Sequence, residues 1–343
     1  MGVQISEIIP RKEISFKDLK GRVVVVDAFN TLYQFLTTIR QPDGTPLMDR
    51  KGNITSHLSG LFYRNINLLL EGIKLVYVFD GTPPELKKEE REKREELKEI
   101  AKAKYEKAKA EGNIEDMRKY SQQFVKISDK IIKQSKSLLE AMGIPIVQAP
   151  GEGEAQVAYL SRVKKWIAAS QDYDSLLYGA PILIRNLTLS KKRKTYSGNY
   201  VDVNLELIEL ESLLNHLQIN LDQLICLGIL VGTDYNPGGV RGIGQKMALN
   251  IVREYKYPVK IFEYVEKSKK YVLDFDWQEI YEQFHKYEVD KEVKIEFKKP
   301  DYEKIKKILL DYDFSENRVD SGINKLKQIE ETKKQRGLSE FIN

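Results

Sequence analysis

The chain has 343 residues, 41% of them hydrophobic, which is enough for one large domain or two smaller ones with a real core. Lys and Arg outnumber Asp and Glu by 56 to 51, and the resulting charge of +5 is compatible with a polyanionic partner but does not require one. The single cysteine excludes an internal disulfide framework, and no apolar run reaches the roughly 18 residues of a membrane span. We therefore expect a globular, intracellular protein without a membrane partner.

The first strong pattern predicts a strand followed by a helix. Val23 to Val26 form an unbroken β-branched run, and apolar residues then recur at helical spacing from Phe29 to Ile39. The turn-rich segment QPDGTP separates this helix from a second one over residues 58–69, which leads into the apolar run LVYVF at 75–79. Apolar strands that alternate with amphipathic helices are typical of a parallel sheet covered on both faces.

Residues 85–141 have a different character, because they are dense in charged residues and helix formers. Two helices with a break near Gly112 and Asn113 are predicted. The first of them has too few apolar residues to bury much surface. We therefore expect a protruding, mobile hairpin rather than a core element.

The sheet pattern then resumes and gives way to helices. The apolar runs IPIVQ at 144–148, WIAAS at 166–170 and PILIR at 181–185 predict three more strands. From about residue 205 the pattern predicts helices, in ELIELESLLNHL, LDQLICLGILVG and GVRGIGQKMALNIVREY. A Lys-rich stretch from 264 ends in KKQRGLSEFIN, which we expect to be a loose tail.

Carboxylates follow four of the predicted strands. In chain order they are Asp27, Asp80, Glu152 with Glu154, and Asp172 with Asp174. Any one of them has a simpler explanation as a turn or capping residue. Because the carboxyl ends of parallel strands share one edge of a sheet, however, all six should converge there. Such a cluster must either raise its pKa values or bind cations, and cations are the more economical explanation.

The segment APGEGEAQ at 149–156 places two of these acids around one glycine. One acid would complement the partial positive charge of a helix N-terminus, but the second needs another reason. We expect Gly153 to let the backbone turn so that Glu152 and Glu154 reach the same metal cluster.

The donor types narrow the identity of the metal. Oxygen-only sites suit Mg²⁺ or Mn²⁺, whereas Zn²⁺ favours His and Cys. The three histidines and the cysteine lie outside these motifs and are expected to be structural or at the surface: His57, His216, His285 and Cys226. Two divalent ions about 4 Å apart are the usual device for hydrolysing a phosphodiester. The residues alone therefore predict this reaction class.

Five motifs, in this order and spacing, resemble the flap endonuclease family of structure-specific 5′ nucleases, most closely its archaeal members: VVVDAFNTLYQFL, YVFDGTPPELK, APGEGEAQ, SQDYDSLLYGAP and VGTDYNPGGVRGIGQKMAL. The resemblance covers roughly residues 1–340. It implies an α/β fold with a mostly parallel central sheet and helices on both faces, a PIN-like 5′ nuclease core that carries a helical arch or clamp and a helix-hairpin-helix element.

The resemblance also implies a domain organisation. A single nuclease domain spans 1–330 and comprises an N-terminal core at 1–84, a helical arch at 85–140, a core continuation at 141–262 and a C-terminal helical part at 263–330. The helix-hairpin-helix lies at about 225–255, and a flexible tail occupies 331–343.

By resemblance, seven acids bind metal: Asp27, Asp80, Glu152, Glu154, Asp172, Asp174 and Asp234. Asp234 follows an apolar helix, so it is not found by looking for acids at the ends of predicted strands. In the family two Mg²⁺ ions, with Mn²⁺ as a substitute, activate the water that attacks the scissile phosphate and leaves a 5′ phosphate. Lys87 and Arg94 match the arch residues that polarise this phosphate. Without the resemblance they would be read as ordinary solvated helix charges.

Three residues match positions that contact DNA near the junction in the family. Tyr33 corresponds to the aromatic on which a base stacks, although its spacing also fits a buried helix face. Arg40 and Arg64 match basic positions near the junction.

The segment GVRGIGQKMAL predicts a phosphate site. Gly242 and Gly244 permit a tight turn whose backbone N–H groups open the next helix. With Lys246 they resemble the helix-hairpin-helix that grips a duplex backbone. Contacts to phosphates predict sequence-independent, salt-dependent binding.

The C-terminal QRGLSEFIN resembles the peptide by which family members bind the sliding clamp. The matching residues are Gln335, Leu338, Phe341 and Ile342, and Ile342 stands where a second aromatic is usual.

Together these features predict a 5′ flap endonuclease and 5′-3′ exonuclease that acts on DNA junctions in Okazaki fragment maturation and repair. We expect a monomer, cytoplasmic and associated with the nucleoid. Two alternatives stay open: a non-catalytic DNA-junction binding protein with the same fold, and a ribonuclease of the related nuclease-core class.

Overall fold

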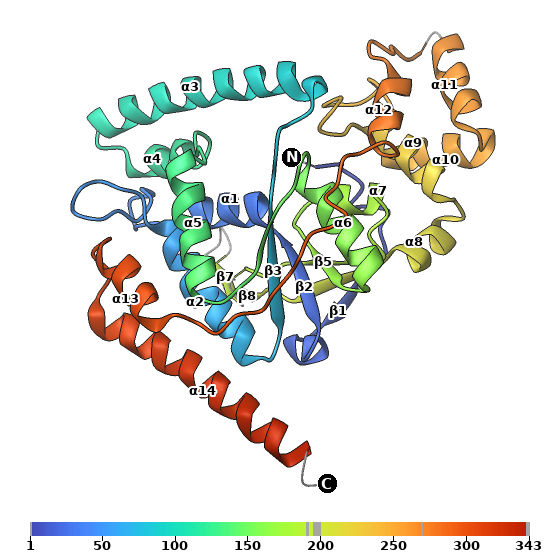
Figure 1. Cartoon of the computed structure of the whole chain (residues 1–343). Coiled ribbons are helices and arrows are strands. Elements are labelled where there is room, and N and C mark those ends of the chain that lie inside the picture. The colour runs from blue at the N-terminus through green and yellow to red at the C-terminus, as the bar shows by residue number, and fades with distance from the viewer. Residues whose placement is uncertain (1, 190–191, 195–199, 269, 341–343) are drawn as a thin grey trace.

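A seven-stranded sheet forms the centre of the computed structural model, which describes residues 2–189, 192–194, 200–268 and 270–340 (Figure 1). Five adjacent strands are parallel, namely β4 (Ile146–Gln148), β3 (Lys74–Phe79), β2 (Val23–Asp27), β5 (Ile167–Ala169) and β6 (Ile182–Arg185). Next to β6, β9 (Leu205–Glu209) and then β1 (Lys12–Ile14) extend the sheet in antiparallel fashion. The predicted mostly parallel sheet is confirmed.

Helices cover both faces of the sheet because its strands are apolar on both sides. In β2, Val24 and Val26 belong to one hydrophobic core, whereas Val25 belongs to the other. The first core holds α1 (Ala28–Thr38), α2 (Ser56–Leu70), α5 (Asp129–Ala141), α13 (Tyr302–Leu310) and α14 (Glu316–Glu340). The second core holds α6 (Gly153–Lys164), α7 (Asp174–Leu177), α8 (Leu210–Leu217), α9 (Leu221–Val231), α10 (Gln245–Tyr255), α11 (Pro258–Lys267) and α12 (Trp277–Gln283).

The prediction that ELIEL (206–210) begins a helix is wrong, because its first four residues belong to β9 and the helix α8 starts only at Leu210. Leu205 and Ile208 are both buried, but in opposite cores. Residues three apart lie on opposite faces of a strand but on the same face of a helix. Their spacing alone therefore does not decide whether this segment is a strand or a helix. The segment forms a strand because it pairs with β6 on one side and β1 on the other.

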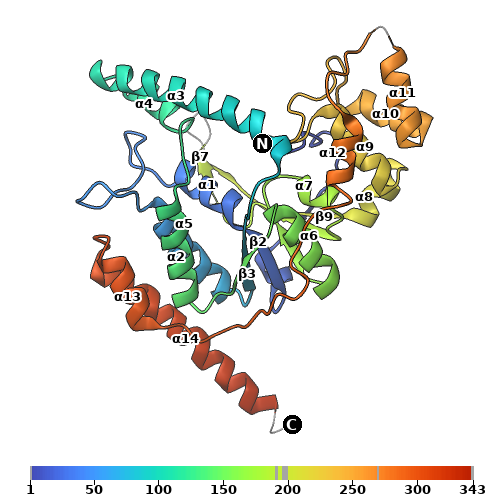
Figure 2. The same ribbon diagram turned by 45° about the horizontal axis from the view of Figure 1, so that its top comes forward.

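The charged segment after β3 forms the predicted hairpin and one further helix. After the short 3₁₀ turn η2 (Glu85–Lys87), α3 (Lys88–Ala110) and α4 (Ile114–Ser121) are separated by Gly112 at φ +68°. Figures 1 and 2 show α3 as a long helix across the top of the molecule with α4 beneath it. The prediction of only two helices missed α5, whose Leu138 and Leu139 are buried in the first core, with the helix packed against α2.

The C-terminal tail differs from the loose segment that we expected, since α14 continues to Glu340. Val319, Ile323 and Leu326 anchor its first turns in the core, and the Lys, Glu, Gln and Arg residues that follow favour a helix. Propagating a helix that is already nucleated needs little further stabilisation. Phe341 and Ile342 lie outside the described residues.

The apolar helix α9 is buried along its length and turns back into α10. Its capping box, in which Asn220 and Gln223 satisfy each other's backbone N–H groups, fixes where the helix starts. In the described part of the chain no single helix is long and apolar enough to cross a membrane, although α8 and α9, bent by 78°, meet that test together.

Candidate active site

The carboxyl ends of the parallel strands bring the predicted acids to one edge of the sheet. Asp27 is the last residue of β2, Asp80 directly follows β3, and Asp172 lies in the turn after the neighbouring β5. Glu152 occupies the N-cap position of α6, which follows β4, and Glu154 lies in the first turn of this helix. This convergence follows the general rule for open parallel sheets.

Burial and mutual repulsion raise the pKa of several of these acids. Burial, followed by the charge of Glu152, raises the pKa of Asp80 to about 6. Burial, followed by the charge of Asp234, raises the pKa of Asp174 to about 7. Burial and the neighbouring Asp174 also raise the pKa of Glu154. These acids are therefore close enough to interact electrostatically with one another.

Two basic side chains from the charged hairpin reach the acid cluster. Lys87 Nζ lies 2.6 Å from Glu152 Oε2 and 3.7 Å from Asp234 Oδ2. Arg94 Nη2 lies 3.0 Å from Asp234 Oδ1, and its Nε donates to Glu90 on the preceding turn. Burial alone would raise the pKa of Asp234, but Lys87 and Arg94 lower it. The predicted basic residues are thus joined to the predicted acids.

The donor set suits a hard divalent cation, because it offers seven carboxylates and neither His nor Cys. Within the described residues, however, no three of these side chains are close enough to form a ready-made metal site. Unneutralised carboxylates repel one another, and Lys87 and Arg94 supply the positive charge on one side of the cluster. Burial and then the charge of a neighbouring carboxylate raise the pKa of both Asp80 and Asp174, and a bound cation would favour their ionised forms.

Gly153 acts differently from the prediction. Its backbone N–H donates to Asp80 Oδ1 at 2.7 Å, and a Cβ at this position would lie only 2.3 Å from the same oxygen. Glycine is therefore required for close approach, rather than for an unusual turn. The result is that the N-terminus of α6 holds the acid of β3 in place.

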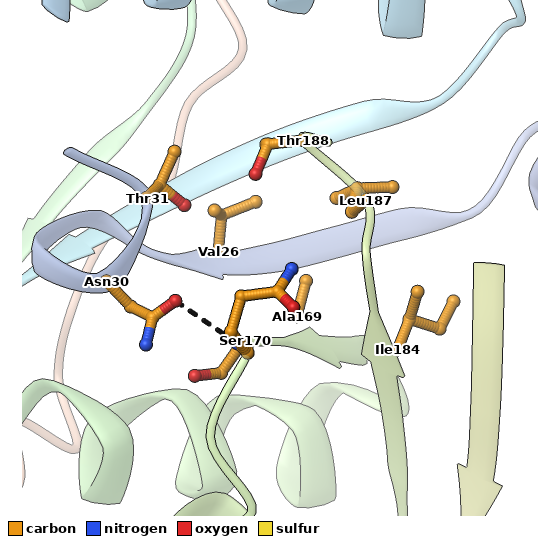
Figure 3. A pocket seen from close by; sticks show the side chains of 9 residues that line it. Val26, Asn30, Thr31, Ala169, Ser170, Ile184, Leu187 and Thr188 are labelled. Atoms are coloured by element: carbon orange, nitrogen blue, oxygen red, sulfur yellow. Dashed lines mark hydrogen bonds between the residues drawn. The ribbon is translucent and has the colours of Figure 1, made fainter. Parts of the chain in front are cut away.

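Asn30, which the sequence did not single out, ties two acids together. Its backbone N–H donates to Asp27 Oδ1 at 3.1 Å, and its Nδ2 donates to Asp172 Oδ2 at 2.8 Å. Its Oδ1 accepts from the N–H of Gln171 at 3.2 Å, the contact drawn in Figure 3. Figure 3 shows Asn30 and Ser170 at the wall of a small pocket between α1 and the turn after β5.

The N-terminal segment also reaches the cluster. The N–H of Val3 donates to Asp174 Oδ1 at 2.7 Å, and Val3 and Ile5 are buried in the second core. A Cβ at Gly2 would lie 2.6 Å from the Cβ of Asp172, so only glycine fits there. No local pattern predicts this contact, because the segment reaches the site through tertiary packing.

Tyr33 lies on the outer face of α1, with 46% of its surface exposed. The buried face of the helix is formed by its neighbours Leu32, Phe35 and Leu36. The alternative that Tyr33 packs in the core is therefore wrong, and the ring is free to contact a ligand.

The two predicted junction arginines are half-buried. Arg40 donates to the carbonyl oxygens of Leu36 and Gly44 at 2.9 and 2.6 Å, so it braces the loop after α1. Burial lowers the pKa of both Arg40 and Arg64. A role in DNA contact stays a prediction for both.

The predicted phosphate turn opens α10, as expected. Gly242 adopts φ +89°, and Gly244 is the N-cap of the helix. Open space surrounds the position of a Cβ on Gly244, and Lys246 is exposed in the first turn. A helix N-terminus that faces open space with a lysine beside it suits a phosphate group.

The four predicted clamp-binding residues are only partly described. Gln335 and Leu338 lie in α14, and nothing is described of their side chains. Phe341 and Ile342 lie outside the described residues. Clamp binding therefore stays a prediction.

Two family models match the chain, the XPG N-terminal domain over residues 1–101 and the XPG I-region over residues 143–234. Among curated proteins, Flap endonuclease 1 of Pyrococcus furiosus is 52% identical, with 100% of this chain and 99% of the relative covered. Flap endonuclease 1 of Saccharolobus solfataricus is also 52% identical, with 97% of each chain covered.

Solved structures agree with these relatives. Flap endonuclease-1 from Methanococcus jannaschii has a TM-score of 0.76 and 42% identity, with 97% of this chain and 100% of that chain covered. The catalytic core of Rad2 in complex with DNA substrate has a TM-score of 0.69 at 23% identity, covering 92% and 96% of the two chains, which shows a shared fold only.

Proposed function

The chain belongs to the flap endonuclease family, and on this premise we propose that it cleaves 5′ flaps at DNA junctions by metal-dependent phosphodiester hydrolysis. It also acts as a 5′-3′ exonuclease, in the maturation of Okazaki fragments and in repair. Full-length similarity to the archaeal relatives supports this activity class.

One observation carries the proposal. Acidic side chains from four strand ends meet two basic side chains of the hairpin, Lys87 and Arg94, at one edge of the sheet. A structural role does not account for this cluster, because burying like charges together costs stability. The same arrangement suits a reaction in which a phosphate must be bound among carboxylates.

The acids and bases have complementary tasks in this reaction. Bound divalent cations supply the Lewis acidity that activates water and stabilises the leaving oxygen. The seven carboxylates would hold these cations, and Mg²⁺ or Mn²⁺ would suit their oxygens. Lys87 and Arg94, now held by Glu152 and Asp234, are within reach of a phosphate that enters the cluster. They would neutralise the charge that develops on it.

The surfaces around the cluster supply the DNA contacts. Tyr33 offers an exposed ring for stacking a base, as unpaired nucleic acid requires. The turn at Gly242 and Gly244 with Lys246 holds the duplex backbone. Because these contacts do not read bases, substrate shape supplies the specificity.

The direct test is cleavage of an end-labelled 5′-flap duplex with and without Mg²⁺. Asp172→Ala should abolish cleavage and leave flap binding within about twofold, since the metal-binding acids act in the chemical step. Asp274→Ala, which removes an exposed acid away from the cluster, is the control and should cleave normally. Full cleavage by Asp172→Ala would refute the metal assignment.

The same assay separates the two alternatives. A non-catalytic junction-binding protein would bind the flap and show no Mg²⁺-dependent turnover. A ribonuclease would prefer single-stranded RNA of matched sequence over the DNA flap. Faster turnover of the DNA flap than of either a blunt duplex or the RNA supports the proposal.

The C-terminal residues 335–343 are proposed to bind a sliding clamp. Deleting them should leave basal flap cleavage intact, because the segment follows the part of α14 that is anchored in the core. Stimulation by the clamp should be lost. If the truncated protein is stimulated as strongly as the full chain, the clamp assignment is wrong.

A further inference from the structure

Lys87 lies over the face of an aromatic ring that the motifs did not assign. Its Nζ is 4.9 Å from the centroid of the Tyr235 ring. Both side chains are largely shielded from water, with 16% of Lys87 and 9% of Tyr235 exposed. A cation over a ring gains most when both are desolvated.

The ring is held rigidly. The hydroxyl groups of Tyr235 and Tyr178 are hydrogen-bonded at 2.7 Å, and Phe284 packs edge-on against Tyr235 with ring centroids 5.5 Å apart. Tyr178 in turn packs against Phe284 and Tyr287. Side chains at the C-terminal ends of α7 and α12 thus hold the ring in place.

The backbone next to Tyr235 is also fixed. Its N–H donates to Thr233 Oγ1 at 3.1 Å, and the Thr233 hydroxyl donates to Asn236 Oδ1 at 2.7 Å. Asn236 Nδ2 then donates to the carbonyl of Ile229 in α9. The turn that carries Asp234 therefore also determines where the ring lies.

The other partners of Lys87 are Glu152 and Asp234, both proposed to hold metal in the active enzyme. Once Glu152 and Asp234 bind metal cations, their negative charge is neutralised and they attract the Lys87 ammonium less strongly. The ring, by contrast, is neutral and binds no metal. A lysine has a flexible four-carbon stem, so it needs such a support to keep its ammonium at one point.

We infer that Tyr235 is a positioning residue, whose ring face holds the Lys87 ammonium in place for the scissile phosphate. The inference rests on the proposed function and deepens it. Because the ring attracts the cation without using an oxygen acceptor, the N–H donors that point away from the ring stay available for oxygen ligands.

The test measures single-turnover cleavage of a labelled 5′ flap. Tyr235→Leu should lower the rate about 10-fold, the size expected from losing a desolvated cation–ring contact, with flap binding within about twofold. Tyr235→Phe should restore most of the lost rate, because it keeps the ring. Tyr287→Leu removes a ring from the same aromatic cluster without touching Lys87, and should stay within about twofold of wild type.

A double-mutant cycle separates positioning from a general structural effect. If Tyr235 acts through Lys87, Tyr235→Leu should cause no further loss in a Lys87→Ala background. An equal loss in both backgrounds would overturn the inference. So would a normal rate for Lys87→Ala, but Mg²⁺-dependent cleavage lost in Asp172→Ala would still support the proposed function.

A second series covers the case in which Tyr235→Leu does not fold. Phenylalanine with one, two or three ring fluorines at position 235 keeps the packing and progressively weakens the negative ring face. The logarithm of the cleavage rate should fall stepwise with fluorination. A rate independent of fluorination would overturn the inference.

Discussion

Individual side chains at the acid cluster are arranged to compensate charge. Lys87 and Arg94 pair with Glu152 and Asp234 at one side, and the pKa values of Asp80 and Asp174 are nevertheless raised. Backbone donors stabilise the remaining charge, from Gly153 to Asp80 and from Val3 to Asp174. In the proposed reaction, bound cations would neutralise the carboxylates, and a phosphate would take their place as the partner of Lys87 and Arg94.

Asn30 should control how well the cluster binds metal, because it links the turn after β5 to α1 through two side-chain hydrogen bonds. Asn30→Ala should raise the Mg²⁺ concentration for half-maximal cleavage about 10-fold, the usual cost of losing a residue that orients a ligand. Calorimetric titration of Mn²⁺ into the protein should show the same weakening without substrate.

Asn53 provides the matched control for Asn30. It donates to Asp49 Oδ2 at 2.6 Å, which is a similar Asn–Asp contact away from the cluster. Asn53→Ala should leave the Mg²⁺ dependence unchanged. Equal effects of the two substitutions would show that Asn30 has no specific role in metal binding.

Tyr33→Ala should slow flap cleavage and change the free energy of unfolding by less than about 0.5 kcal/mol, because the ring is exposed. Phe35→Ala, two residues on, removes a ring that is 1% exposed and should cost about 3 to 5 kcal/mol. Chemical denaturation and a cleavage assay measure both effects. A comparable loss of stability in the two variants would argue against a stacking role.

Among the elements, the hairpin of α3 and α4 has one end at the acid cluster, whereas the rest of it is loosely packed. η2 and the start of α3 carry Lys87 and Arg94 to the cluster. Farther along, only Ala101, Tyr105 and Ala108 of α3 are buried, and Tyr105 packs on Phe124 at 5.2 Å. So little apolar burial is typical of an element that opens with a low free-energy cost.

The helix α10 presents its N-terminus to solvent, and this element should dominate the salt dependence of duplex binding. Lys246→Ala should reduce the slope of log binding constant against log salt concentration by about one, for one lost phosphate contact. Binding measured by fluorescence anisotropy at several salt concentrations tests this. Lys304→Ala, an exposed lysine in the first turn of α13, is the control and should leave the slope unchanged.

At the scale of the whole molecule, the acid cluster opposes folding when metal is absent. The pKa of Asp174 is raised from its ordinary value of 3.8 to about 7. Below about pH 4 both states are protonated at this group, so it has no effect on stability. As pH rises from about 4 to 7 the unfolded state loses this proton first, and the folded state becomes relatively less stable.

Asp174→Asn should therefore stabilise the metal-free protein at about pH 8, by at least about 1.4 kcal/mol, the equivalent of one pKa unit. The advantage should shrink towards pH 5 and reverse when saturating Mg²⁺ is present, because wild type gains the binding energy. Calorimetric melting in EDTA and in Mg²⁺ tests both signs. A difference in melting temperature that does not depend on pH would contradict this account.

Much of the fold and of the acid cluster could be predicted because local pattern encodes it. The apolar runs that form β2, β3 and β5 each precede an acid, and parallel strands necessarily share the edge where these acids lie. The position of Asp234 and the roles of Lys87 and Arg94 needed the family resemblance, since a turn acid and helix charges have no distinctive local signal.

The sequence by itself determined which segments are apolar strands, where several of these strands end and which acids follow them along the chain. Only the tertiary structure decided that Leu205–Glu209 is a strand and that α5 is a core helix. It also decided that Asn30 donates to Asp172 and that Lys87 lies over the ring of Tyr235. The physical reason is range. Periodicity reports which side of an element faces a core, whereas contacts such as that between Asn30 and Asp172, 142 residues apart, depend on how separate elements pack.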